Sequence, residues 1–145
     1  MAERSREDWL LQEVLLEIDP TGWRMLIGCM LLNQTTRKQV DRVWPVLFEL
    51  FPDAVSVTTC DDAGDILETM TYPLGLYATR SKRIVKFCDA WVKGSWEFID
   101  ELPGCGEYAK DSWRIFKDGD RSFVPYDKEL RKYLEVTRSQ VEPLQ

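Results

Sequence analysis

The sequence contains no histidine, and its four cysteines, Cys29, Cys60, Cys88 and Cys105, are scattered along the chain. Without an imidazole, Ser-His-Asp catalysis, histidine-ligated zinc and histidine proton relays are all excluded. Cysteine metal sites need closely spaced pairs, and disulfide frameworks are usual in short secreted chains, so isolated cysteines favour a reduced intracellular compartment. Any acid–base chemistry must therefore come from carboxylates, lysine or tyrosine.

Long hydrophobic runs are also missing. The longest apolar stretch, Met25 to Leu32, is far shorter than the ~20 residues that span a bilayer. The N-terminal residues 1–6 lead into an acidic amphipathic stretch, so we expect neither a membrane span nor a secretory signal. A chain of 145 residues that is 44% hydrophobic can bury one core, which predicts a single monomeric domain over 1–145 with frayed tails at 1–6 and 137–145.

The net charge of −6 at first disfavours nucleic acid, because phosphate binding relies on lysine and arginine. The charge is unevenly distributed, however. Residues 1–78 hold 6 basic and 13 acidic side chains, whereas residues 79–132 hold 12 basic and 10 acidic ones. A local basic face on such a chain predicts weak, strongly salt-dependent binding to duplex DNA through the second segment.

Apolar residues recur at three- and four-residue spacing along most of the chain, which predicts an all-α fold. Pro45 should kink its helix or mark the first turn, and Val55–Thr58, which alternates like a strand without a partner, is interpreted as a loop. The uniformly apolar segment 23–32 is expected to be the central buried helix. The predicted helices lie near residues 7–18, 23–32, 37–51, 61–70, 79–93, 96–102, 107–116 and 127–136.

A glycine hairpin, Leu102-Pro103-Gly104-Cys105-Gly106, separates two of these helices. Its glycines allow a tight turn and a close backbone approach, and its amides precede a helix N-terminus, where an anion is favoured. The hairpin therefore indicates a helix-hairpin-helix motif around residues 96–116 that contacts phosphate through Gly104, Cys105 and Gly106. The alternative is a plain turn between two helices.

Beyond the hairpin come one amphipathic helix, a polar loop and Phe123-Val124-Pro125-Tyr126-Asp127 at the mouth of the last helix. In this arrangement the chain resembles the helix-hairpin-helix DNA glycosylase superfamily, which carries a catalytic aspartate about twenty residues after its hairpin. Four segments resemble more closely the glycosylase domain of the methyl-CpG-binding domain protein 4 family: Leu31-Leu32-Asn33-Gln34-Thr35, Pro73-Leu74-Gly75-Leu76-Tyr77, Ile84-Val85-Lys86-Phe87 and Asp111-Ser112-Trp113-Arg114-Ile115-Phe116.

This resemblance runs from about residue 10 to residue 134 and implies a monofunctional enzyme. It would flip thymine or uracil mispaired with guanine out of duplex DNA and hydrolyse the N-glycosidic bond. A nuclear location is likewise implied by the resemblance alone. No cofactor is expected beyond a K⁺ or Na⁺ ion on the carbonyls of Leu102 to Gly106, because residues 106–145 lack the cysteines that an iron–sulfur cluster needs.

The resemblance makes Asp127 the catalytic carboxylate, which would stabilise positive charge on the sugar and position water. An ordinary helix N-cap is the alternative for Asp127, and both roles can coexist. Tyr108 occupies the position of the lysine that forms a Schiff base in glycosylases that also nick the backbone. A phenol cannot do this, so we expect an intact abasic product and assign Tyr108 to the base pocket, with core packing as the alternative.

Gln12 corresponds to a glutamine that reads the flipped pyrimidine, although its spacing from Trp23 departs from the family pattern, and a solvent-facing glutamine is the alternative. Leu11 is assigned to the same pocket. Leu76 and Gln34 match the residues that fill the gap left by the flipped base. Gln34 stands where the close relative has arginine, which leaves the opposite-strand contacts in doubt, and Leu76 has a core position as its alternative.

Five basic residues are candidates for the phosphate-facing surface, with ordinary solvated side chains as the alternative: Arg80, Lys82, Lys110, Lys128 and Arg131. Two other functions stay open. One is a related glycosylase for a different damaged base. The other is a non-catalytic helix-hairpin-helix module that binds DNA or a partner protein, which the acidic first half favours slightly.

Overall fold

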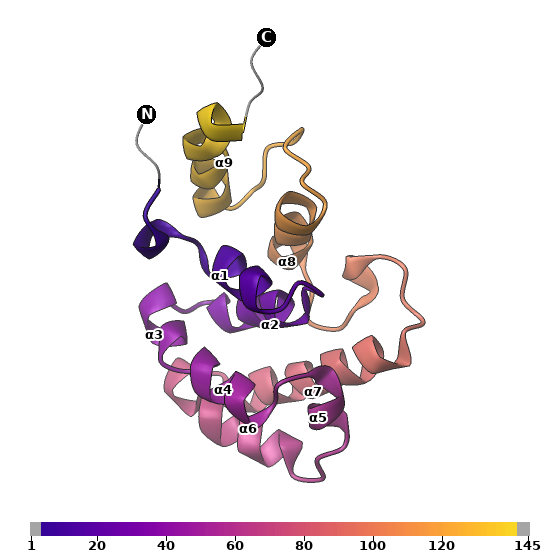
Figure 1. The fold of residues 1–145 in the computed structure, drawn as a ribbon. Helices are drawn as coiled ribbons and strands as arrows, with labels where there is room; N and C mark the ends of the chain where they lie inside the picture. Colours follow the sequence, from indigo (N-terminus) through magenta and orange to yellow (C-terminus); the bar gives the residue numbers. More distant parts are fainter. Residues whose placement is uncertain (1–3, 142–145) are drawn as a thin grey trace.

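A computed structural model describes residues 4–141, and within that range every regular element is helical, which confirms the all-α prediction (Figure 1). The α-helices are α1 (Leu11–Ile18), α2 (Trp23–Leu32), α3 (Arg37–Asp41), α4 (Trp44–Leu50), α5 (Ala54–Thr58), α6 (Ala63–Thr71), α7 (Tyr77–Lys93), α8 (Glu107–Ser112) and α9 (Lys128–Val141). No helix among these residues has the length and apolar character needed to cross a membrane.

Helix α2 is the centre of the fold, as its uniformly apolar sequence predicts. Met25, Leu26 and Ile27 are fully buried, and α2 packs against α1, α3, α7 and α8. In Figure 1, α3 to α7 lie on one side of α2, and α8 and α9 lie on the other. A Cβ at Gly28 would lie 2.7 Å from Leu15 Cδ1, so this glycine lets α1 cross α2 closely.

Helix α9 is attached through a second, smaller cluster made by the buried Ile115, Leu130 and Leu134. Tyr108 packs against both this cluster and the main core. The start of α9, where Asp127 lies, is therefore held against α8 by apolar contacts that involve Tyr108 itself.

Two of the sequence-based predictions in the first half are wrong in detail. The single helix expected over 37–51 is divided into α3 and α4, with Pro45 in the first turn of α4, where its missing N–H costs nothing. Residues 55–58 form helix α5 instead of a loop. Asp53 Oδ1 caps α5 by accepting the amide hydrogen of Ser56 at 2.8 Å, and the burial of Ala54 and Val57 outweighs their strand-like alternation.

The helix expected over 96–102 is reduced to one 3-10 turn at Ile99–Glu101. The Glu101 carboxylate accepts the amide hydrogens of Glu97 and Phe98, at 3.0 and 2.6 Å. These bonds cap the turn at Phe98, so the helical turn begins only at Ile99. The helix expected over 107–116 is α-helical only to Ser112 and continues as a π-helical turn over Trp113–Lys117. The first arm of the helix-hairpin-helix motif is therefore much shorter than predicted.

The predicted frayed tails are also corrected where the structure describes them. Arg4 forms an ion pair with Glu13 at 2.7 Å, and α9 continues to Val141 with Thr137 buried. The remaining parts of that prediction, at 1–3 and 142–145, lie outside the described residues.

We predict that Gly104→Ala destabilises the hairpin, whereas Gly106→Ala does not. Gly104 has φ +80°, and a Cβ there would lie 2.5 Å from Met30 Cε. Gly106 has φ −90°, and a Cβ there would meet no atom within 4 Å. Urea unfolding followed by circular dichroism should show a loss of about 1–3 kcal/mol for Gly104→Ala and a change within about 0.5 kcal/mol for Gly106→Ala. Equal stability of the two variants would contradict this account of the turn.

Candidate functional site

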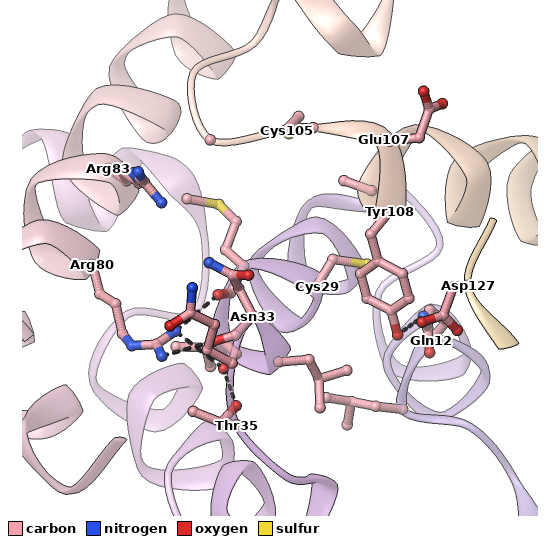
Figure 2. Close-up of a pocket in the computed structure, with 18 of the residues that line it drawn as sticks. Gln12, Cys29, Asn33, Thr35, Arg80, Arg83, Cys105, Glu107, Tyr108 and Asp127 are labelled. Carbon is pink, nitrogen blue, oxygen red and sulfur yellow. Dashed lines mark hydrogen bonds between the residues drawn. The ribbon is translucent and has the colours of Figure 1, made fainter. Parts of the chain in front are cut away.

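A cleft of about 1080 Å³ lies where five segments meet: the start of α1, the end of α2 with the loop after it, the start of α7, the hairpin with α8, and the start of α9. Asp127, Gly104 and Gly106 all line this cleft, so the predicted carboxylate and the hairpin share one site. Figure 2 shows several of the lining side chains, including Gln12, Tyr108 and Asp127.

Gln12 and Tyr108, 96 positions apart in the sequence, are hydrogen-bonded to each other in the cleft wall. Gln12 is only 2% exposed, which removes the solvent-facing alternative. Its Nε2 donates to Tyr108 Oη at 2.7 Å and to Ser112 Oγ at 3.0 Å. Both hydrogens of the amide group are thereby engaged, and Oε1 is the acceptor end of this side chain. Leu11, the other predicted pocket residue, is buried and also lines the cleft.

Tyr108 stays a neutral phenol at physiological pH. Burial raises its pKa above the ordinary range, and the neighbouring Cys29 and Asp127 raise it further. Cys29 is a cleft residue that sequence reasoning missed, because a cysteine inside an apolar helix gives no signal of its own. Burial raises the pKa of the Cys29 thiol to about 12, so it too is uncharged.

Asp127 has the N-cap role considered from the sequence, and its position in the cleft is compatible with the catalytic role. It is half-buried, lines the cleft, and its Oδ2 accepts the amide hydrogen of Leu130 at 3.0 Å, as an N-cap of α9 does. Figure 2 shows it beside the hydroxyl end of Tyr108 and near Gln12. Arg131 donates to the carbonyls of Pro125 and Tyr126, so it holds the segment that leads into Asp127. The side chain of Arg131 remains exposed, so the expectation that it faces phosphate stays a prediction.

The two predicted plug residues share an unusual backbone conformation. Gln34 (φ +60°) and Leu76 (φ +50°) are the non-glycine residues with positive φ in the described part of the chain. Both are exposed and line the cleft, and the 53% exposure of Leu76 excludes the core position considered for it. Left-handed backbone at such residues is costly and is concentrated at functional sites.

The predicted phosphate-facing set is only partly supported. Arg80 is 6% exposed and its guanidinium donates to backbone carbonyls, so it is a structural residue here. Cys105 is buried and its amide already donates to the Leu102 carbonyl at 3.2 Å, which removes it as a phosphate donor. Lys110 lies 3.8 Å from Asp100 in an exposed ion pair.

Lys82 and Lys128 are exposed on α7 and α9, outside the cleft lining. Arg83, which sequence reasoning overlooked, is exposed and does line the cleft. Its position three residues after the predicted Arg80 was the available signal, since residues three or four apart share a helix face.

Four carboxylates line the cleft. Asp127 was predicted from the sequence, and Glu107, Asp111 and Glu129 were not. Asp111 is buried, and this burial together with the charge of Glu107 raises its pKa. The cleft also contains Arg37, Arg80 and Arg83, so acidic and basic side chains both line it.

The all-helical fold, the glycine hairpin and the aspartate at a helix start in one cleft define a helix-hairpin-helix DNA repair protein. Comparison with known families agrees: residues 27–140 match the model described as HhH-GPD superfamily base excision DNA repair protein. The chain therefore belongs to this superfamily, which confirms the resemblance found in the sequence.

Among individual proteins, the chain is similar to a methyl-CpG-binding domain protein 4-like protein of Arabidopsis thaliana, with 36% identity over 117 residues. That match covers 80% of this chain and 26% of the plant protein. It is also similar to a thymine-DNA glycosylase of Aeropyrum pernix, with 30% identity over 93 residues, 59% of this chain and 41% of the archaeal protein. The chain thus spans less than half of either relative.

We predict that Tyr108 is the tyrosine whose ionisation is most delayed in alkali. Its raised pKa means that the folded protein keeps a proton that the unfolded chain loses near pH 10. The resulting stabilisation is complete below pH 10 and is lost as the pH rises toward the folded-state pKa. The ultraviolet absorbance of the wild type and of Tyr108→Phe is followed as the pH is raised. The two titration curves should differ by the ionisation of one tyrosine at a pH above the ordinary range. A difference with an ordinary midpoint would show that Tyr108 is not buried in this way.

Proposed function

We propose that the chain is a monofunctional DNA glycosylase that hydrolyses the N-glycosidic bond of thymine or uracil mispaired with guanine in duplex DNA. The observation that carries this proposal is that Asp127 opens into the same cleft as the Gln12–Tyr108 pair, the hairpin and both left-handed residues. Membership of the repair superfamily and similarity to a thymine-DNA glycosylase support it.

The charge of the cleft suits this reaction. Breaking the bond between C1′ and the base leaves the electron pair on the base and positive charge on the sugar. Asp127 stabilises that charge and positions a water molecule, whose oxygen bonds to C1′ while its proton replaces the lost bond on the leaving base. The further carboxylates Glu107 and Glu129 strengthen the field that favours a cationic sugar.

The product we propose is an intact abasic site. Strand cleavage by a bifunctional glycosylase needs an amine that forms a Schiff base with the sugar. Tyr108 offers a phenol instead, and no lysine is among the described residues that line the cleft. Lys110, the nearest lysine in sequence, is directed to Asp100.

Selection of the base is assigned to Gln12. With its amide hydrogens held by Tyr108 and Ser112, Gln12 presents Oε1 as an acceptor. Thymine and uracil carry an N3–H donor that matches this acceptor, whereas cytosine has an acceptor at N3. The side chain of Gln12 therefore favours the two deamination products over the normal base.

Contacts to the DNA backbone are proposed for the amides of Gly104 and Gly106 and for Arg83, Lys82 and Lys128. The hairpin carbonyls are candidate ligands for a monovalent cation, although those of Leu102 and Gly106 already accept one amide hydrogen each, from Cys105 and Lys110. We further propose a nuclear location, which the resemblance to a methyl-CpG-binding domain protein 4-like protein supports, and action as a monomer.

We predict that Asp127→Asn abolishes base release but leaves folding and DNA binding intact. Asparagine caps a helix as well as aspartate does, but it carries no charge to stabilise the sugar cation. Asp127→Ala should lose activity equally and in addition lose about 1 kcal/mol of stability. Alkali-induced cleavage of G·U and G·T duplexes measures activity, and urea unfolding measures stability.

Undiminished cleavage by Asp127→Asn would remove Asp127 from the chemistry. A panel of other mismatches and damaged purines tests the alternative substrates. Wild-type protein that binds duplex but releases no base from any substrate would favour the non-catalytic module.

We predict that Ser112→Ala weakens the discrimination against cytosine. Loss of the Ser112 hydroxyl frees one amide hydrogen of Gln12, so the amide can rotate and offer a donor to the cytosine edge. The ratio of uracil to cytosine release opposite guanine should fall by about tenfold, the effect of ~1.4 kcal/mol. The matched control is Thr79→Ala, at an exposed residue that lines the cleft on α7. An unchanged ratio in Ser112→Ala would contradict the role given to the Gln12 amide.

A further inference from the structure

Arg80 has no carboxylate partner in the described part of the chain, yet it is 6% exposed. Five backbone carbonyls take the place of a counter-ion. Its Nε donates to Gly75 at 2.7 Å, and its two terminal nitrogens donate to Asn33 at 2.7 Å, Met30 at 3.2 Å, Leu31 at 3.3 Å and Leu74 at 3.5 Å. Figure 2 shows the guanidinium reaching toward the backbone near Asn33.

The carbonyls contacted by Arg80 belong to two separate segments. Those of Met30 and Leu31 lie in the last turn of α2, where helix carbonyls lack intrahelical partners and the helix dipole attracts a cation. Those of Leu74 and Gly75 lie in the turn that precedes α7. One planar guanidinium therefore joins the end of α2 to the turn before α7.

The two shortest of these hydrogen bonds fall at particular peptides. Asn33 immediately precedes Gln34, and Gly75 immediately precedes Leu76. Gln34 and Leu76 are the residues in left-handed conformation whose exposed side chains line the cleft. Arg80 thus fixes the peptide plane that leads into each of the two strained residues.

We propose that Arg80 is a positioning residue that holds Gln34 and Leu76 at a fixed separation, so that they enter the DNA stack as one unit when the base is flipped. This inference rests on the proposed function. Strained backbone persists only where its surroundings determine it, and the fork of Arg80 is the shared restraint on both positions. Lysine cannot replace it, because an ammonium group does not present donors in two fixed directions.

The test measures base flipping without chemistry. In the Asp127→Asn background, 2-aminopurine placed next to the uracil of a G·U duplex becomes more fluorescent when the neighbouring base leaves the stack. Adding Arg80→Met should reduce the flipped fraction about tenfold, which corresponds to the loss of one to two charge-assisted hydrogen bonds. Arg80→Lys should also reduce it, because lysine keeps the charge but lacks the fork. Lys86→Met, an exposed charge loss on the same helix, should leave it unchanged.

A double-mutant cycle separates positioning from other roles. If Arg80 acts through the plug residues, Arg80→Met should add less than about twofold once Leu76→Ala is present, because both changes remove the same function. If Arg80 contacted phosphate, the effects of Arg80→Met and Leu76→Ala on the flipped fraction would multiply. The slope of the logarithm of the DNA-binding constant against the logarithm of the salt concentration would also fall in magnitude by about one. Multiplicative effects or such a change in slope would overturn the inference.

Stability is followed in parallel by thermal unfolding. If Arg80→Met does not fold, the test rests on Arg80→Lys alone. A folded Arg80→Lys variant whose fluorescence rise equals that of the protein with Arg80 would overturn the inference. Absence of any rise when Arg80 is present would count against the proposed function itself and therefore against both. A rise with Arg80 that persists in folded Arg80→Met would overturn only the positioning role.

Discussion

The burial of α2 is the constraint on which the rest of the structure depends. A helix that is apolar on nearly every face must be covered on all sides, and the packing of α1, α3, α7 and α8 around it achieves this. The last carbonyls of this helix lack intrahelical partners and take donors from elsewhere in the protein. Arg80 and Thr35 supply such donors, and the cleft forms where that end of α2 meets the hairpin and α9.

The features that depend on local sequence could be predicted. Helical periodicity gave the fold class, the apolar run gave the central helix, and the resemblance placed Gln12, Tyr108 and Asp127, which the fold brings into one cleft. The sequence-based errors have tertiary causes. Val57 is helical because it packs in the core, and Arg80 is indistinguishable in sequence from its exposed neighbours Lys82 and Arg83 until the carbonyls near it are known.

The distribution of charge also becomes understandable at the level of the site. A protein of net charge −6 would repel DNA if its charge were uniform. The cleft is acidic where a sugar cation would form, around Asp127 and Glu129, whereas Arg83 lies at its α7 side. The sequence could indicate the more basic half of the chain, but the separation of sign within one cleft depends on packing.

Two arginines hold backbone segments that lead into residues lining the cleft. Arg131 holds the carbonyls of the segment leading into Asp127, and Arg80 holds those leading into Gln34 and Leu76. Each fixes peptide planes one or two residues before a functional side chain, so the side chain itself stays free for substrate. Arginine suits this role because its donors diverge in a fixed plane and it remains charged when buried. In both places a buried or half-buried backbone segment at the cleft is held by an arginine side chain rather than by regular secondary structure.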